Sequence, residues 1–172
     1  MIIMHMRGNP KTMQSASNTD YSNKNRSTGK RNGDDGVVSG VVSELMQRSL
    51  AAEAAGIPRW LQIVDPGIGF AKTAQGNLSL LKGVDALRQS CGNLPFLFGP
   101  SRKGFIGKIT GEEDPAKRDF GTIAACLAVI RQRSSNDNDV QGGDAICNIL
   151  RVHNVKAIKQ AVTVYEAIIN AK

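Results

Sequence analysis

Short apolar runs alternate along the chain with longer stretches of helical periodicity. The four apolar runs are "MIIMH" (1–5), "WLQIVD" (60–65), "PFLFG" (95–99) and "AICNILRV" (145–152). Apolar residues recur every three or four positions in the stretches that follow them, 37–55, 76–90, 118–133 and 155–171. This pattern predicts four strands, each followed by a helix.

Strands that alternate with helices favour a parallel sheet, because parallel neighbours need a crossover connection between them. The runs are apolar on both faces, which is typical of a sheet that helices cover. The predicted fold class is therefore α/β. A chain of 172 residues suits a single domain with a real core, spanning residues 1–172.

Two polar segments interrupt this pattern. Residues 15–36 are rich in Ser, Asn and Gly and almost lack apolar residues, so we predict a disordered insertion there. The segment "SSNDNDVQGG" (134–143) is a second loop insertion, which lengthens the connection before the last strand.

The net charge is +7, which suits a partner that is either a nucleic acid or a phosphorylated metabolite. Between Arg7 and Arg31 there are six basic residues against one acidic residue, Asp20. Tyr21 is the one aromatic residue in this segment, so no interleaved aromatic pattern supports RNA binding, and we expect no nucleic-acid partner. The apolar stretches are too short to span a membrane, and we expect no membrane partner either.

Three cysteines, Cys91, Cys126 and Cys147, lie far apart among apolar residues. This spacing predicts buried, reduced thiols rather than a disulfide framework, and it does not match a metal-binding pattern.

Polar residues follow directly after each predicted strand. They are His5, Met6 and Arg7; Asp65; Ser101, Arg102 and Lys103; and Arg151 and His153. Because ligands of parallel α/β proteins bind at the carboxyl ends of the strands, we expect these four groups to form one site.

Two of these groups suggest recognition of a heterocycle and of an anion. Asp65 precedes a glycine-rich turn and could accept paired N–H donors, and Phe70 could form an apolar wall. Alternatively, Asp65 closes its loop and Phe70 belongs to the core. In "FGPSRKGF" (98–105) the Ser101 hydroxyl could hold a carboxylate or phosphate, and Lys103 is either a donor to the ligand or a solvated lysine.

The last group, "RVHN" (151–154), places Arg151 and His153 on one side of a strand. Two such donors suit a pyrophosphate. Phosphate recognition by a P-loop is not predicted, because its glycine and lysine spacing is not met.

The motifs "HMRGNPKTMQ", "DPGIGFAKT", "FGPSRKGFIGKITG" and "ILRVHNV" occur in this order. The chain thereby resembles the dihydropteroate synthases, particularly the plant type fused to a pterin pyrophosphokinase. That family has a (β/α)8 TIM barrel, and the four units match its second half. The resemblance implies a C-terminal half of the pterin-binding domain, with the N-terminal half of the barrel as its missing partner.

Members of that family join 6-hydroxymethyl-7,8-dihydropterin diphosphate to 4-aminobenzoate, which gives 7,8-dihydropteroate and pyrophosphate in folate synthesis. The resemblance implies that Asp65, Lys103 and Met6 bind the pterin. It assigns the aminobenzoate to Ser101 and Phe70, and the diphosphate to Arg151 and His153. No further catalytic residue is assigned. Mg²⁺ is the implied cofactor, but its ligand is expected outside this chain, and no metal ligand is assigned within it.

The same resemblance implies a homodimer for the complete enzyme and an inactive isolated chain. The implied compartment is mitochondrial for a plant-type enzyme and cytoplasmic otherwise, with the targeting segment outside this chain. One departure is Asn154, where the family commonly has an acid. Two alternatives remain open: a pterin-binding module of a methyltransferase, and a basic interaction protein. "FGPSRKGF" favours the synthase, because a methyltransferase module needs no aminobenzoate site.

Overall fold

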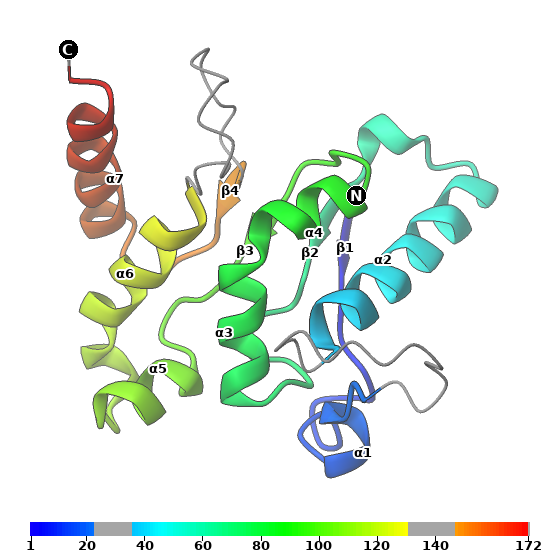
Figure 1. The fold of residues 1–172 in the computed structure, drawn as a ribbon, viewed down its shortest axis with the longest axis horizontal. Helices are drawn as coiled ribbons and strands as arrows, with labels where there is room; N and C mark the ends of the chain where they lie inside the picture. Colours follow the sequence, from blue (N-terminus) through cyan, green and yellow to red (C-terminus); the bar gives the residue numbers. More distant parts are fainter. Residues whose placement is uncertain (23–35, 131–146, 172) are drawn as a thin grey trace.

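The computed structural model describes residues 1–22, 36–130 and 147–171, and it shows an α/β arrangement with parallel strands (Figure 1). The strands are β1 (Ile2–Met4), β2 (Ile63–Asp65), β3 (Leu97–Phe98) and β4 (Ile149–Leu150). β1 pairs with β2 and β3 with β4, while a single parallel bridge joins Val64 of β2 to Phe96. The predicted parallel α/β fold is confirmed, with strands shorter than the apolar runs.

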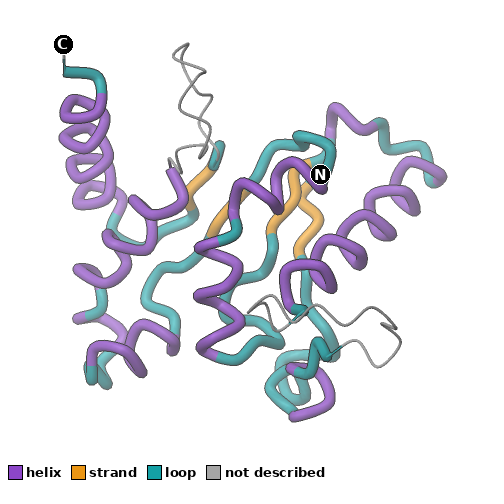
Figure 2. Tube along the Cα trace, in the orientation of Figure 1, coloured by secondary structure: helices purple, strands orange, loops and turns teal. Residues whose placement is uncertain are grey.

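Helices connect the successive strands (Figure 2). The main helices are α2 (Val37–Ala54), α3 (Ala74–Lys82), α4 (Val84–Ser90), α5 (Gly104–Thr110), α6 (Asp119–Ile130) and α7 (Val155–Ile169). The shorter elements are α1 (Ala16–Thr19) and 3₁₀ turns at Arg59–Leu61 and Pro115–Lys117. α2 packs on α3, α3 on α6, and α6 on α7, so the helices follow one another in space as they do along the chain.

The helix predicted over 76–90 differs from the observed structure at both its start and its middle. It begins earlier, at Ala74, because the Thr73 hydroxyl accepts a hydrogen bond of 3.0 Å from the Gly76 N–H and caps the first turn. It also divides into α3 and α4 at Gly83, whose N–H still bonds to the Ser79 carbonyl. Glycine disfavours a helix interior, which the apolar periodicity alone does not reveal.

The core lies between the strands and the helices. Val37, Val41 and Leu45 on one face of α2 are buried, and the rings of Phe96 and Phe98 stack with their centroids 5.9 Å apart. The three cysteines are buried and form no disulfide, as predicted. Burial raises the pKa of the Cys91 thiol to about 11.

Part of the predicted disordered insertion makes ordered contacts. Residues 15–22 include α1 and the buried Tyr21, whose hydroxyl donates a hydrogen bond of 3.1 Å to the Ala71 carbonyl. The expectation of disorder therefore does not hold for these residues, because Tyr21 packs against the loop after β2. Residues 23–35 and the insertion at 134–143 lie outside the described residues. Among the described helices, none combines the length and the apolar character needed to span a bilayer.

Candidate functional site at the strand ends

The carboxyl ends of the parallel strands lie on the same side of the fold, called here the strand-end edge. The polar groups that follow the strands in the sequence lie in the loops that leave this edge. The residue after β1, His5, donates its backbone N–H to the Asp65 carbonyl at the end of β2, at 2.8 Å. Arg151, directly after β4, donates its backbone N–H to the Phe98 carbonyl at the end of β3, at 2.9 Å. The loops that carry the candidate residues therefore leave the strands side by side.

Asp65 lies nearly buried at the centre of this edge. Its Oδ1 accepts a hydrogen bond of 2.7 Å from the Gly67 N–H, and its Oδ2 lies 3.6 Å from the Arg151 guanidinium. Burial raises the pKa of Asp65, and the Gly67 hydrogen bond and the Arg151 charge oppose that rise. The carboxylate closes its own loop through one oxygen while the other faces a cation, so the two sequence interpretations of Asp65 are compatible.

Phe70 and Lys103 meet above the loop that follows β2. The Lys103 Nζ lies 3.8 Å from the centroid of the Phe70 ring, within cation–π range. The lysine stem lies against Gly69, where an added Cβ would come within 2.9 Å of the Lys103 Cδ. Burial lowers the pKa of Lys103, as does the nearby Arg151 charge. Lys103 is therefore partly buried beside Asp65 and Phe70 rather than solvated.

Ser101 and His153 form a direct pair. The Ser101 hydroxyl lies 2.8 Å from the His153 Nδ1, and the backbone N–H of His153 donates to the same hydroxyl at 3.2 Å. Ser101 is buried, with 5% of its surface exposed. The residues assigned to the aminobenzoate and to the diphosphate thus touch each other. Met6 follows His5 at the same edge, where its carbonyl accepts a hydrogen bond of 2.8 Å from Arg48.

Arg102 has a supporting position in "FGPSRKGF". It binds both carboxylate oxygens of Asp119, at 2.8 and 3.1 Å. Asn154 donates to Asp119 at 3.0 Å and caps α7 by accepting the Ala157 N–H at 3.1 Å. The Arg102 hydrogen bond, with that of Asn154, lowers the pKa of Asp119 to about 2. An acid at position 154 could cap the helix, but its ionised form could not donate to Asp119.

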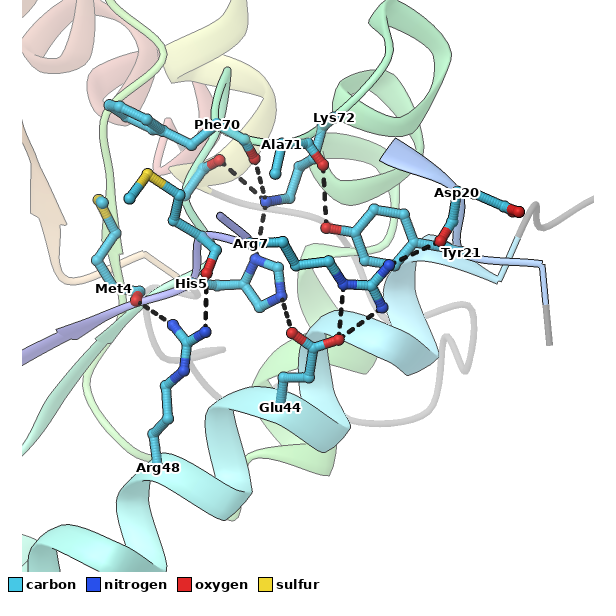
Figure 3. A network of polar contacts seen from close by, with 12 residues as sticks. Met4, His5, Arg7, Asp20, Tyr21, Glu44, Arg48, Phe70, Ala71 and Lys72 are labelled. Atoms are coloured by element: carbon cyan, nitrogen blue, oxygen red, sulfur yellow. Dashed lines mark hydrogen bonds and ion pairs between the residues drawn. The ribbon is translucent and has the colours of Figure 1, made fainter. Parts of the chain in front are cut away.

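Sequence reasoning missed a polar network beside this edge (Figure 3). Lys72 contacts His5, His5 contacts Glu44 on α2, and Glu44 accepts two hydrogen bonds from Arg7. Arg7 also lies 3.8 Å over the ring of Tyr21. Of these residues, the sequence pattern marks only His5 and Arg7, by their place after the first strand. Lys72 lies within the motif "DPGIGFAKT", but the motif does not indicate that this lysine is buried against His5, which is 67 positions away.

The described residues do not fit a magnesium site. Among them, no three His, Cys, Asp or Glu side chains are grouped so that they could hold a metal ion. Asp65, the acid at the strand ends, already accepts the Gly67 N–H and faces Arg151. We therefore derive no step of the chemistry through a metal held by these residues.

Comparison with known proteins decides the family. A sequence profile of pterin binding enzymes matches residues 1–134. The chain belongs to the pterin-binding enzyme family. It is 37% identical over 180 aligned positions to the mitochondrial folate synthesis bifunctional protein of Pisum sativum, covering 99% of this chain and 30% of that protein.

Two crystal structures of dihydropteroate synthase from Thermus thermophilus resemble this chain. The complex with 6HMPPP has a TM-score of 0.74 at 33% identity, over 98% of this chain and 55% of that one. The complex with 4-aminobenzoate has a TM-score of 0.71 at 34% identity, over 98% of this chain and 56% of that one. The chain therefore spans about half the length of the bacterial enzyme, and less than a third of the pea protein.

Proposed function

We propose that this chain forms one half of a dihydropteroate synthase: the last four βα units of a (β/α)8 barrel. A first half would supply the other four units and close the barrel. Two observations support this proposal. The strands form two parallel pairs, β1 with β2 and β3 with β4, which a parallel bridge from Val64 to Phe96 joins in chain order. The chain also aligns over 98% of its length with about half of a dihydropteroate synthase.

In the proposed reaction, the amine nitrogen of 4-aminobenzoate attacks the exocyclic methylene of 6-hydroxymethyl-7,8-dihydropterin diphosphate. The bond between that carbon and the diphosphate oxygen breaks, and pyrophosphate leaves with the bonding electrons. The amine then loses a proton, giving 7,8-dihydropteroate. Such a reaction depends on positioning the amine and on stabilising the leaving diphosphate.

The convergence of Asp65, Lys103 and Arg151 at the strand ends carries the proposal. The buried carboxylate of Asp65 would accept hydrogen bonds from the amino and ring N–H groups of a pterin, as it accepts one from the Gly67 N–H in this structure. Lys103 would donate to the same heterocycle, and Met6 would pack on its ring. Arg151, with 57% of its side chain exposed, is available to the diphosphate together with His153.

Phe70 and Ser101 would hold the ring and the carboxylate of 4-aminobenzoate. The Ser101–His153 hydrogen bond supports a shared boundary between the two substrates, because each residue is assigned to a different one. That boundary is where the amine must approach the methylene. We also propose a homodimer for the completed enzyme. Its compartment would be mitochondrial for a plant-type enzyme and cytoplasmic otherwise.

Steady-state kinetics test the proposal in an enzyme where the first half of a related synthase completes this chain. Asp65→Asn removes one charge from a buried site, so a loss of about 1–3 kcal/mol is expected, seen mainly as a higher KM for the pterin diphosphate. Phe70→Ala should instead raise the KM for 4-aminobenzoate. Asp85→Asn, on α4 away from the strand ends, is the matched control. Unchanged kinetics for Asp65→Asn would refute the assignment.

A further inference from the structure

Lys72 is a buried lysine that the proposed chemistry does not use. It ends the loop after β2 and has only 3% of its surface exposed. Its Nζ lies 3.0 Å from the His5 Nδ1, 3.1 Å from the Gly67 carbonyl oxygen and 2.9 Å from the Phe70 carbonyl oxygen (Figure 3). A lysine ammonium has three N–H donors, so these three acceptors match it fully.

This match fixes the protonation of the neighbouring histidine. His5 can accept from Lys72 only if its Nδ1 carries no proton, which places the ring proton on Nε2. Nε2 lies 3.1 Å from the Glu44 Oε2, a carboxylate oxygen that accepts that proton. Complete burial, and then the Lys72 charge, lower the pKa of His5 to about 4, in agreement with a neutral ring.

The ammonium closes the turn that carries Phe70. It binds the carbonyls of Gly67 and Phe70, at the two ends of the turn, while the Phe70 N–H bonds back to the Gly67 carbonyl at 3.0 Å. The Phe70 ring projects from this turn to lie 3.8 Å from the Lys103 Nζ. The position of that ring therefore depends on the conformation that Lys72 holds.

Two other side chains hold the carbonyls of the same loop. Gln14 donates to the Gly69 carbonyl at 3.0 Å, and Tyr21 donates to the Ala71 carbonyl at 3.1 Å. Ala71 has a φ of 51°, a left-handed conformation that alanine adopts only under constraint. Side chains thus bind the carbonyls at four positions in 67–71, as expected of a loop whose function requires one conformation.

We propose that Lys72 is a positioning residue: its buried ammonium fixes the turn at residues 67–70 and so places the Phe70 ring against Lys103 at the aminobenzoate site. Only the identity of that substrate rests on the proposed function. Stability alone is a poor reason for a buried lysine, because taking an ammonium out of water costs free energy that its hydrogen bonds must first offset. Burial lowers the pKa of Lys72 to about 7, which reflects that cost.

Hydrogen exchange on the 172-residue chain tests the positioning directly. Lys72→Met keeps the aliphatic stem and removes the ammonium, and Lys82→Met makes the same change at an exposed lysine that ends α3. We expect amides of residues 67–71 to exchange at least about tenfold faster in Lys72→Met, with unchanged exchange in α2. Lys82→Met should match the wild type. Unchanged loop exchange, or equally faster exchange throughout α2, would overturn the proposal.

A measurement on the wild-type protein covers the case in which Lys72→Met does not fold. In ¹⁵N-detected NMR spectra below about pH 7, the protons of the Lys72 ammonium should exchange slowly with water, so that its signal is observed. That signal should also show a coupling or a nuclear Overhauser effect to the His5 ring. An ammonium that exchanges as fast as that of Lys82 would contradict the proposal. His5→Ala, which removes one acceptor, should shift the Lys72 signal and leave the Lys82 signal in place.

Kinetics of the completed enzyme then connect the turn to the substrate. Lys72→Met should raise the KM for 4-aminobenzoate about tenfold, with less than about a twofold change in the KM for the pterin diphosphate. Equal increases in both would contradict a role at the aminobenzoate site. A wild-type enzyme without synthase activity would refute the proposed function alone, since the exchange experiment still decides whether Lys72 positions the turn.

Discussion

Gly67 occupies a position where the backbone and the space around it both require glycine. Its φ is +69°, and a Cβ added there would collide with the carbonyl oxygen of His5. That carbonyl cannot move freely, because the His5 N–H is bonded to the Asp65 carbonyl at 2.8 Å. We therefore predict that Gly67→Ala is strongly destabilising.

The magnitude follows from two separate contributions. An alanine in the left-handed region costs about 1–2 kcal/mol. Relief of the collision must separate the turn from β1, with the loss of a buried hydrogen bond such as Gly67 N–H to Asp65, at about 1–3 kcal/mol. The sum is a decrease of about 2–5 kcal/mol in the free energy of unfolding.

Gly111→Ala separates these contributions. Gly111 has a φ of +75°, but an added Cβ would meet nothing within 4 Å, so only the backbone strain of about 1–2 kcal/mol applies. Urea unfolding at several protein concentrations, with equal m-values, would measure both variants. Equal midpoints for Gly67→Ala and Gly111→Ala would show that the close approach of β1 and the turn contributes nothing.

Two further predictions concern charge and assembly. Burial lowers the pKa of Lys72 to about 7 in the folded chain, whereas a lysine in the unfolded chain has a pKa of about 10. Between about pH 7 and pH 10 the unfolded chain therefore binds more protons than the folded chain. Over this range the free energy of unfolding of the wild type should rise with pH relative to that of Lys72→Met. The rise is at most about 1.4 kcal/mol per pH unit. If urea unfolding gives a free-energy difference between the two proteins that does not change with pH, this prediction is wrong. The isolated 172-residue chain should self-associate through its open strand edges and form no dihydropteroate, whereas a monodisperse monomer with steady turnover would contradict both expectations.

The order of the elements could be predicted because it rests on local patterns. The apolar runs located the four strands of the described residues, and the positions that follow the strands located Asp65, Lys103, Arg151 and His153 at their carboxyl ends. Parallel pairing alone brings such positions together, whatever the side chains do. The division of the predicted 76–90 helix at Gly83 was not predicted, because it depends on a single residue. The ordered part of the 15–36 segment was not predicted either, because it depends on a tertiary contact of Tyr21.

The network that joins Lys72 to α2 could not be predicted, because its side-chain contacts join residues far apart in the sequence. Lys72 is 67 positions from His5, and His5 is 39 positions from Glu44. A lysine next to the start of a helix is ordinarily exposed, and nothing local indicates that α2 will bring a carboxylate to β1. Burial of Lys72 is thus a property of the assembled fold.

The alternation of charged and neutral groups along this network explains how a lysine can remain buried there. The cation of Lys72 is followed by a neutral His5, then by the carboxylate of Glu44, and then by the cation of Arg7. Although burial opposes ionisation of Glu44, the hydrogen bonds from Arg7 and His5 and the charge of Arg7 lower its pKa. A protonated His5 would place two cations at 3.0 Å, which its low pKa prevents. The neutral ring therefore carries a directional hydrogen bond from the turn to α2 without repulsion, and so links the position of Phe70 to that of the helix.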